Sequence, residues 1–420
     1  MRLYLFFSLF HLFHTLLPTK IAFGSCADFF KLSPSKDIFP AIISSSPSLF
    51  FWIGDMAYYQ NPSDYSLTSA QIEANMNRIS YQELIKKVRV NGIWDDHDYG
   101  RNDDIKKNRY KHLIRQLFLD FIYSSAATSS SLPAKSSVSE FDRRFKNQGI
   151  YDSILVDEKV KVILLDCRWN KDEWIGDCDM LGEEQWKWLE NELSDGKGDL
   201  VLIVSGSQIL PQNRLFNPFI PESWYSQSRN KLFNLIKKTG RKGVILLSGD
   251  VHYGEILSYR NFCSSPIEYP LFEMTSSGLT HHLGESWKVK FYDLVVPDTY
   301  NNNSHRFFGF NFGFVEIDWQ EEILKSIIKL QIRDFEGKVM LEKRIVLEEL
   351  GWNQQNATSN KTNEGCEIDK WRGFLIWRNF IDKYGGWYWV IGGVTGLLFV
   401  VVVVLNILKV KKTGAKIKKA

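Results

Sequence analysis

The sequence predicts an α/β layered fold followed by a transmembrane helix, and three observations lead to this prediction. Short apolar runs, each followed by a turn, recur along the chain, which is typical of buried strands. Helical patterns lie between these runs, and such alternation favours α/β layers. A charge-free apolar stretch follows near the C-terminus, and its length fits a membrane span.

The composition allows a large folded core. Of the 420 residues, 44% are hydrophobic and 24% are charged, as in ordinary globular proteins. The net charge of +3 depends on six lysines in the last twelve residues, so the rest of the chain is slightly acidic. This distribution indicates no nucleic-acid-binding surface.

The apolar and amphipathic segments give the expected elements in order. The expected strands are Ile21–Phe23, Leu49–Ile53, Val90–Trp94, Val160–Leu165, Leu200–Val204 and Val244–Leu247. The expected helices are Gln71–Val90, Glu183–Leu193 and Ser226–Lys238. The pattern changes from Phe307, and antiparallel strands are expected at Phe310–Ile317, Leu324–Arg333 and Val339–Val346. The serine-rich stretch Ser124–Ser139 is expected to be a loop.

The N-terminus is interpreted as a signal peptide or another hydrophobic segment within residues 1–19. Arg2 precedes the mostly apolar stretch Leu3–Leu17, as a basic start precedes the apolar core of a signal peptide. The region around Pro18 is not a clean small-residue cleavage site. An uncleaved anchor or a buried first helix is the alternative.

Residues 387–408 are expected to form the transmembrane helix. They carry no charge and span roughly 33 Å as a helix, enough for a bilayer. Trp387, Tyr388 and Trp389 form an aromatic belt at one end, and the basic tail 409–420 lies at the other. Because lysines favour the cytoplasmic side, we expect a single-pass protein with a cytoplasmic C-terminus. A buried core helix is the alternative.

The rest of the chain would then be extracellular or lumenal, with a stem over residues 351–386. Sequons at Asn302, Asn356 and Asn360 fit such exposure. The five cysteines are an odd number, so at least one thiol is unpaired. Cys167 and Cys178 are close in sequence, but sequence alone does not decide whether they pair.

Chemically active residue types follow five of the expected strands. The motifs are Gly24-Ser25-Cys26, Gly54-Asp55-Met56-Ala57-Tyr58, Asp95-Asp96-His97-Asp98, Ser205-Gly206-Ser207-Gln208 and Ser248-Gly249-Asp250-Val251-His252. In open α/β folds, ligands bind at the carboxyl ends of the strands. We therefore expect these side chains to meet at one place.

The residue types fit a centre with two cations. Two neighbouring cations bind a phosphate, activate a water and stabilise the leaving oxygen. Carboxylates with imidazole or thiolate hold such cations. Asp55 suits a bridging ligand, Asp96 and Asp250 add charge, and His97 suits proton donation to the leaving group. Each motif alone is more often a turn or a solvated loop, but their common position at strand ends favours a site.

The order of these motifs resembles the alkaline phosphatase D (PhoD-like) branch of the calcineurin-like metallophosphoesterases. The most specific matches are Trp94-Asp95-Asp96-His97-Asp98 and Ser248-Gly249-Asp250-Val251-His252. The resemblance covers residues 20–350. It implies a four-layer α/β/β/α sandwich of two mixed sheets flanked by helices. The early position of Cys26 leaves no room in this sequence for the large N-terminal β domain common in bacterial members.

The resemblance also implies roles for individual residues. Cys26 and Tyr58 would bind iron, Asp55 would bridge the metals, and His97 would be the acid. Asp96, Asp250 and His252 would complete the ligand set, and Gln208 falls near a further ligand position. Thiolate and phenolate ligands suit ferric iron, whereas carboxylates suit calcium. A dinuclear or multinuclear centre of iron with calcium is therefore implied, with zinc, manganese or magnesium as alternatives.

Further groups are expected near the substrate. Arg101 and Arg168 each suit a grip on phosphate oxygens, and each is equally an expected structural ion-pair partner. The pair His281 and His282 fits a substrate loop, although a surface loop is favoured. Asn102 and Asp103 are expected to support the site or to form a turn.

The leading hypothesis is hydrolysis of a phosphate mono- or diester by a metal-bound hydroxide. The alternative is a membrane-tethered binding protein that keeps the fold without turnover. The complete set of Asp55, Asp96, His97, Asp250 and His252 favours the enzyme, because a degraded relative should have lost several of these groups. The sequence names neither the physiological ester nor the metal.

Overall fold

A computed structural model describes residues 17–28, 36–58, 65–128, 144–173, 178–211, 223–259, 267–284 and 306–352. Residues 1–171 and 179–362 cluster as one compact unit, and Asp172–Cys178 belong to a second unit. The elements described below all lie in the first unit.

The described elements alternate between strands and helices for most of the chain. The strands are β1 Thr19–Gly24, β2 Leu49–Ile53, β3 Arg89–Ile93, β4 Asp152–Val156, β5 Val160–Leu165, β6 Leu200–Ser205, β7 Val244–Ser248, β8 Gly254–Tyr259, β9 Leu271–Ser276, β10 Arg306–Phe307, β11 Asn311–Asp318, β12 Ile327–Asp334 and β13 Val339–Val346. The helices are α1 Phe39–Ser44, α2 Tyr65–Met76, α3 Ile79–Lys87, α4 Asp96–Tyr99, α5 Lys111–Thr128, α7 Gly182–Ser194 and α8 Ser226–Thr239. Short 3-10 turns lie at Ile323–Lys325 and Leu347–Glu349.

The first sheet combines the beginning and the end of the described chain. Its strand order is β13-β12-β11-β1-β2-β3. Strands β1, β2 and β3 are parallel, whereas β1, β11, β12 and β13 pair antiparallel. All five residues of β2 are buried, because a central strand covered on both faces needs a continuous apolar run.

The second sheet has the order β10-β8-β9-β7-β6-β5-β4. Strands β5, β6, β7 and β9 are parallel, and β4, β8 and β10 add antiparallel pairs. Strands β5, β6 and β7 are buried along their whole length. Both sheets are therefore mixed, with their parallel strands at the centre.

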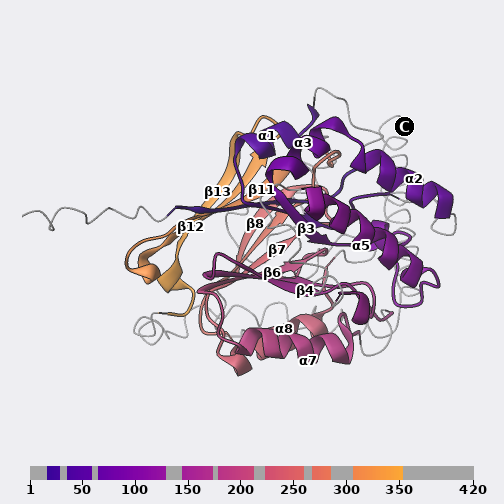
Figure 1. The fold of residues 1–420 in the computed structure, drawn as a ribbon. Coiled ribbons are helices and arrows are strands. Elements are labelled where there is room, and N and C mark those ends of the chain that lie inside the picture. The colour runs from indigo at the N-terminus through magenta and orange to yellow at the C-terminus, as the bar shows by residue number, and fades with distance from the viewer. Residues whose placement is uncertain are drawn as a thin grey trace, which may run out of the picture. The chain divides into compact units, whose positions relative to one another are not determined.

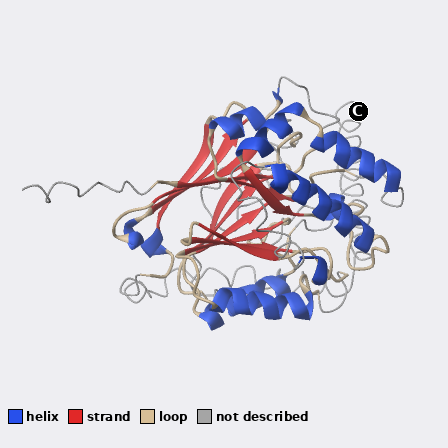
Figure 2. Ribbon diagram, viewed as in Figure 1, coloured by secondary structure: helices blue, strands red, loops and turns tan. Residues whose placement is uncertain are grey.

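The two sheets form the inner layers of the unit, and helices cover their outer faces. Helices α1, α2, α3 and α5 lie over the first sheet, and α7 and α8 lie under the second (Figures 1 and 2). One apolar cluster includes side chains from both sheets, among them Phe23, Trp52, Leu202 and Met274. This arrangement confirms the expected α/β fold with two mixed sheets.

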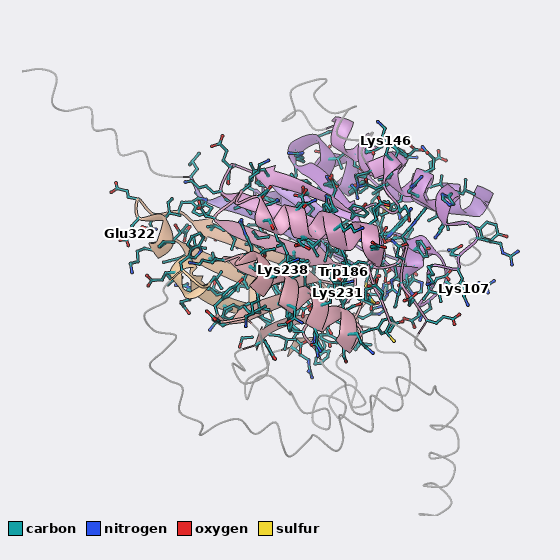
Figure 3. All side chains as sticks on the ribbon, turned by 90° about the horizontal axis from the view of Figure 1, so that it is seen from below. Lys107, Lys146, Trp186, Lys231, Lys238 and Glu322 are labelled. Atoms are coloured by element: carbon teal, nitrogen blue, oxygen red, sulfur yellow. The ribbon has the colours of Figure 1, made fainter. Side chains whose placement is uncertain are left out.

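Helices α7 and α8 are joined side by side on the outside of the second sheet. Figure 3 views this side and labels Trp186, Lys231 and Lys238. The Lys231 ammonium lies 4.5 Å from the centre of the Trp186 ring, and Lys238 Nζ lies 2.5 Å from a carboxylate oxygen of Glu190. The ion pair of Lys238 with Glu190 is exposed and therefore contributes little to stability.

Most of the expected elements are confirmed, with shifts at their ends. The six early strands and the three late antiparallel strands are present. The expected helix Gln71–Val90 is instead two helices, because the chain is extended at Arg78 and strand β3 begins at Arg89. Helix α5 reaches Thr128, so the expected loop Ser124–Ser139 begins later than the serine pattern indicated.

Several elements were not expected, and several expectations fall outside the described residues. Strands β4, β8, β9 and β10 and helices α1, α4 and α5 were missed. The expected signal peptide, most of the stem, the transmembrane segment 387–408 and the tail 409–420 lie largely or wholly outside the described residues. Within the described ranges, no helix is both long and apolar enough to cross a membrane. Cys167 is a buried free thiol, so it is not joined to Cys178.

Strand ends from the two sheets meet around Asp95, which follows β3. A Cβ atom on Gly54, after β2, would lie 2.5 Å from the Asp95 Cβ. A Cβ atom on Gly206, after β6, would lie 2.5 Å from the Asp95 Cγ. Both distances are shorter than any carbon contact, so glycine is required where the two sheets approach the same side chain.

We predict that Gly206→Ala destabilises the protein by about 1–3 kcal/mol, because the added methyl overpacks the buried Asp95 carboxyl. Denaturant unfolding of the purified chain measures this change. Gly196→Ala is the control, since its Cβ meets nothing within 4 Å and only its positive φ opposes the substitution. A Gly206→Ala protein that unfolds at the same denaturant concentration as the wild type would contradict the proposed close contact.

Candidate metal centre

Backbone hydrogen bonds tie the ends of the strands together. The Ala27 N–H donates to the Asp55 carbonyl at 2.7 Å, and the Gly249 N–H donates to the Gly206 carbonyl at 2.8 Å. The first bond joins the ends of β1 and β2, and the second joins the ends of β6 and β7. The segments that follow these strands are therefore held in fixed positions, as a preorganised site needs.

Cys26, Asp55 and Tyr58 form one side of the site. The Cys26 Sγ lies 3.5 Å from Asp55 Oδ2, and the Tyr58 hydroxyl donates to the same oxygen at 3.1 Å. Cys26 and Asp55 are buried. The structure therefore brings together the thiol, the carboxylate and the phenol that the sequence resemblance led us to expect around one metal.

Asp96 and His97 enter from the first turn of α4. Asp95 and Asp98 cap this helix reciprocally. The His97 N–H lies 2.9 Å from Asp96 Oδ1 and 3.3 Å from Asp55 Oδ1. The start of α4 thus fixes Asp96 beside the proposed bridging residue Asp55.

Asp250 and His252 bring the end of β7 to the same place. The side chains form three overlapping groups, and within each group the possible ligand atoms lie within 4.8 Å of one another. The groups are Cys26 with Asp55 and His252, Asp55 with Asp96 and His97, and Asp95 with Asp96 and Asp250. Asp55 and Asp96 each belong to two groups. A shared carboxylate is the arrangement that neighbouring cations need.

Four of the proposed ligands adopt a left-handed backbone conformation. Their φ angles are 63° for Cys26, 52° for Asp55, 76° for Asp250 and 59° for His252. Such a conformation is uncommon for residues other than glycine and costs about 1–3 kcal/mol each in a strained site. Its repetition at the ends of three strands, β1, β2 and β7, indicates that folding aims these side chains at a common point.

A row of rings covers this cluster. The Tyr58 ring lies 4.3 Å from the His97 ring and 4.9 Å from the His281 ring, measured between centres. The His281 ring lies 4.4 Å from the His252 ring. His281 therefore reaches the site, although its sequence favoured a surface loop. His282 instead contacts Phe310 at 4.5 Å.

Arg168 lies beneath the cluster and is fully buried. Its Nε forms an ion pair with Asp95, and one Nη lies 3.9 Å from Asp96 Oδ1. The same guanidinium donates to Ser207 Oγ at 3.1 Å. These contacts favour the structural ion-pair alternative for Arg168 over a grip on substrate.

The loop after α4 brings Asp103 to the site but leaves Arg101 exposed. The Asp103 N–H donates to Asp96 Oδ2 at 2.6 Å, which gives Asp103 a supporting role. Arg101 is exposed, and its backbone N–H donates to Asp104. Among the described residues, no contact places the Arg101 side chain against the proposed ligands.

A buried polar network below the site was missed from the sequence. Gln208 donates to Glu255 Oε2 at 3.1 Å and to Thr275 Oγ1 at 2.9 Å. Glu273 accepts the backbone N–H groups of Ile209 at 2.8 Å and Leu210 at 2.6 Å. The Gln208 amide thus supports the loop after β6. Glu255 and Glu273 were not predicted to be buried, because a search for apolar runs does not detect charged residues inside a sheet.

A model of the PhoD-like phosphatase family matches residues 71–327. The chain belongs to this family. The matched range contains α4 with Asp96 and His97, and the end of β7 with Asp250 and His252. Comparison with the curated proteins found no match.

Solved structures match this chain. A structure of PhoD matches with a TM-score of 0.57 and 16% identity, over 78% of this chain and 68% of the other. A purple acid phosphatase from yellow lupin (Lupinus luteus) seeds matches with a TM-score of 0.47 and 16% identity, over 79% of this chain and 54% of the other. At such identity, the match to PhoD supports the fold alone.

The residues of this PhoD-like phosphatase carry more buried negative than positive charge at the strand ends. Asp55, Asp95, Asp96, Asp98 and Asp250 are all buried. Arg168 and Lys171 are buried cations that favour ionised Asp95 and Asp96. Isolated buried carboxylates are costly unless they are paired or bound to metal. The donor set therefore fits bound cations.

The pKa values of the buried carboxyl groups differ, because only some of these groups lie close to Arg168 and Lys171. Burial raises the pKa of Asp55 well above its usual range, and the neighbouring Cys26 raises it further. Burial also raises the pKa of Asp98 to about 8. For Asp96, burial is outweighed by Arg168 and His97, so its pKa falls to about 2. Asp55 is thus the carboxyl that most needs an additional cation to remain ionised.

We predict that chelator-treated protein is less stable at about pH 8 than at about pH 5. Asp55 and Asp98 have raised pKa values in the fold, so their stabilising protons are retained at low pH and lost as the pH rises. Asp96 stays ionised across this range, since its pKa is lowered. Thermal unfolding at the two pH values, before and after divalent metal is restored, measures the effect.

The variant Asp98→Asn is the control for this pH dependence, because its side chain does not ionise. It should narrow the stability difference between the two pH values. A stripped protein whose stability is the same at both values would contradict the electrostatic analysis of the site.

Proposed function

We propose that this chain is a metal-dependent phosphoesterase that hydrolyses phosphate mono- or diesters. The observation that carries the proposal is the convergence of Cys26, Asp55, Asp96, Asp250 and His252 from four strand ends, with shared carboxylates between overlapping groups. Membership of the PhoD-like phosphatase family supports the same chemistry. Bound cations would attract the negatively charged oxygens of a phosphate mono- or diester. Esters without such a charge are therefore not the expected substrates.

Most residues of the site are proposed to be metal ligands, and one is proposed to be the proton donor. Cys26, Tyr58, Asp55 and His252 would hold one metal, and Asp55 would bridge to a second that Asp96 shares. Asp250 would add charge near Asp96. Thiolate and phenolate favour iron, carboxylates favour calcium, and zinc, manganese or magnesium are further candidates. Bound cations would polarise the phosphoryl oxygens and acidify the attacking water.

His97 is proposed to protonate the leaving alkoxide. Its side chain is half-buried, and its backbone is fixed by Asp55 and Asp96. The imidazole therefore lies at the edge of the ligand cluster, where a leaving group departs toward solvent. Exposed Arg101, one turn further along the chain, remains the proposed contact for substrate oxygens.

The proposed organisation places this domain, residues 20–350, outside the cytosol. Residues 1–19 would direct secretion, 351–386 would form a stem, 387–408 would cross the membrane and 409–420 would stay in the cytoplasm. The charge-free stretch with aromatic residues at one end and lysines at the other supports this topology. Membrane and soluble fractions of cells that produce the full chain test it, with protease protection of the tail.

We predict that Asp55→Ala loses metal and turnover together, because Asp55 is shared by two groups of ligand atoms. Metal analysis of the purified protein and hydrolysis of para-nitrophenyl phosphate and bis-para-nitrophenyl phosphate measure the two effects. Asp120→Ala is the matched control, since this exposed carboxylate lies on α5 and accepts a hydrogen bond from Gln116 at 2.9 Å. Wild-type protein that binds metal but hydrolyses no ester in a broad panel would favour the binding-protein alternative.

We predict that His97→Gln keeps its metal and lowers kcat by about 10²–10⁴-fold for esters with poor leaving groups, as expected for loss of a general acid. The loss should be smaller for para-nitrophenyl phosphate, whose leaving group needs little protonation. Metal analysis accompanies the kinetics. Loss of metal in this variant, with equal losses for both kinds of ester, would make His97 a ligand instead of the acid.

A further inference from the structure

The Cys26 sulfur is surrounded by oxygen atoms, and two of these belong to serine hydroxyls. The Ser277 Oγ lies 2.9 Å from the sulfur, and the Ser25 Oγ lies 3.5 Å from it. The Asp55 carboxylate and the Asp250 carbonyl lie at 3.5 Å and 3.8 Å. All three side chains, Cys26, Ser25 and Ser277, are fully buried.

The two serines differ in where their single hydroxyl proton goes. Ser25 donates its proton to the Ser276 carbonyl at 3.1 Å. Ser277 accepts a hydrogen bond from the backbone N–H of His252 at 2.6 Å. A hydroxyl has one proton and two lone pairs, so Ser277 still has its proton to donate. When Cys26 is a thiolate, the Ser277 hydroxyl can donate this proton to the sulfur across the 2.9 Å contact.

We propose that Ser277 is a positioning residue of the metal centre, which donates a hydrogen bond to the Cys26 thiolate and accepts one from the backbone N–H of His252. The proposal rests on the proposed function, since it assigns Cys26 and His252 to one metal. Ser277 follows β9, whereas Cys26 follows β1 and His252 follows β7. One hydroxyl thus connects ligands that come from both sheets.

This hydrogen bond has a chemical consequence for the sulfur. A donor to a thiolate withdraws electron density from it and weakens its donation to the metal, and hydrogen bonds to sulfur are known to tune metal sites. Removing the donor should therefore lower the energy of charge transfer from sulfur to metal. A residue that merely filled space would leave that energy unchanged.

The test uses the purified full chain with Co²⁺ as the spectroscopic probe. The wild type should show a sulfur-to-cobalt charge-transfer band in the near ultraviolet. Ser277→Ala should move this band to longer wavelength, and Ser277→Thr, which keeps the hydroxyl, should restore it. Ser25→Ala is the comparison variant: its hydroxyl lies farther from the sulfur, at 3.5 Å, and also donates to the Ser276 carbonyl, so this variant should move the band less than Ser277→Ala does.

The outcomes distinguish a failure of the proposed metal centre from a failure of the proposed role of Ser277. A wild type without any Co²⁺ charge-transfer band would overturn the thiolate ligand and so the proposed centre. A normal wild-type band that keeps its wavelength in folded Ser277→Ala would overturn the role of Ser277 alone. If the alanine variant does not fold, Ser277→Thr and Ser277→Val decide, because they share one shape and differ in the hydroxyl.

Discussion

Negative charge held away from water at the carboxyl ends of the strands is the constraint around which this protein is organised. Five aspartates lie buried beside a buried thiol, and burial of unpaired carboxylates costs several kcal/mol or more. One of them, Asp95, is neutralised by Arg168 from below. Asp55, Asp96 and Asp250 offer their oxygens to the overlapping groups of ligand atoms, and bound cations are the chemistry that would balance their charge.

The left-handed residues and the closely packed glycines bring these acidic side chains together. Left-handed backbone at Cys26, Asp55, Asp250 and His252 turns each chain sharply after its strand. The glycines beside Asp95 let strand ends approach more closely than any side chain would permit. Strain of this kind persists only where the surroundings determine it. Here the surroundings are long buried strands, which do not shift when one turn relaxes.

Much of this arrangement was readable from the sequence because the parallel strands are continuous apolar runs. Leu49–Ile53 and Val244–Leu247 stand out against the polar motifs that follow them, and the position of Asp55 and Asp250 follows directly. Strands β8 and β9 were missed because buried Glu255 and Glu273 interrupt their apolar pattern. Their polar groups are satisfied by Gln208 and by backbone N–H groups distant in sequence, which no local pattern reveals.

The roles of individual polar residues were harder to predict than their presence at the site. Arg168 fits a phosphate-binding arginine until its partner Asp95 is known, and that partner is adjacent only in space. His281 was favoured as a surface residue because its sequence is that of a loop. Hydrogen bonds from Leu279 and Thr280 to Ser25 and Cys26 hold this loop over the cluster, and such pairing depends on the tertiary fold.

The pairing of β1 with β11 has a consequence for biosynthesis. Thr19, near the start of the chain, lies opposite Ile317, so β1 gains this neighbour only after some three hundred residues have been translated. Until then Cys26 belongs to an incomplete sheet edge. A nascent chain with an accessible thiol is open to oxidation and to capture by unintended soft metals. In the proposed phosphoesterase, the side of the metal centre that carries Cys26 is therefore complete only after β11 has paired with β1.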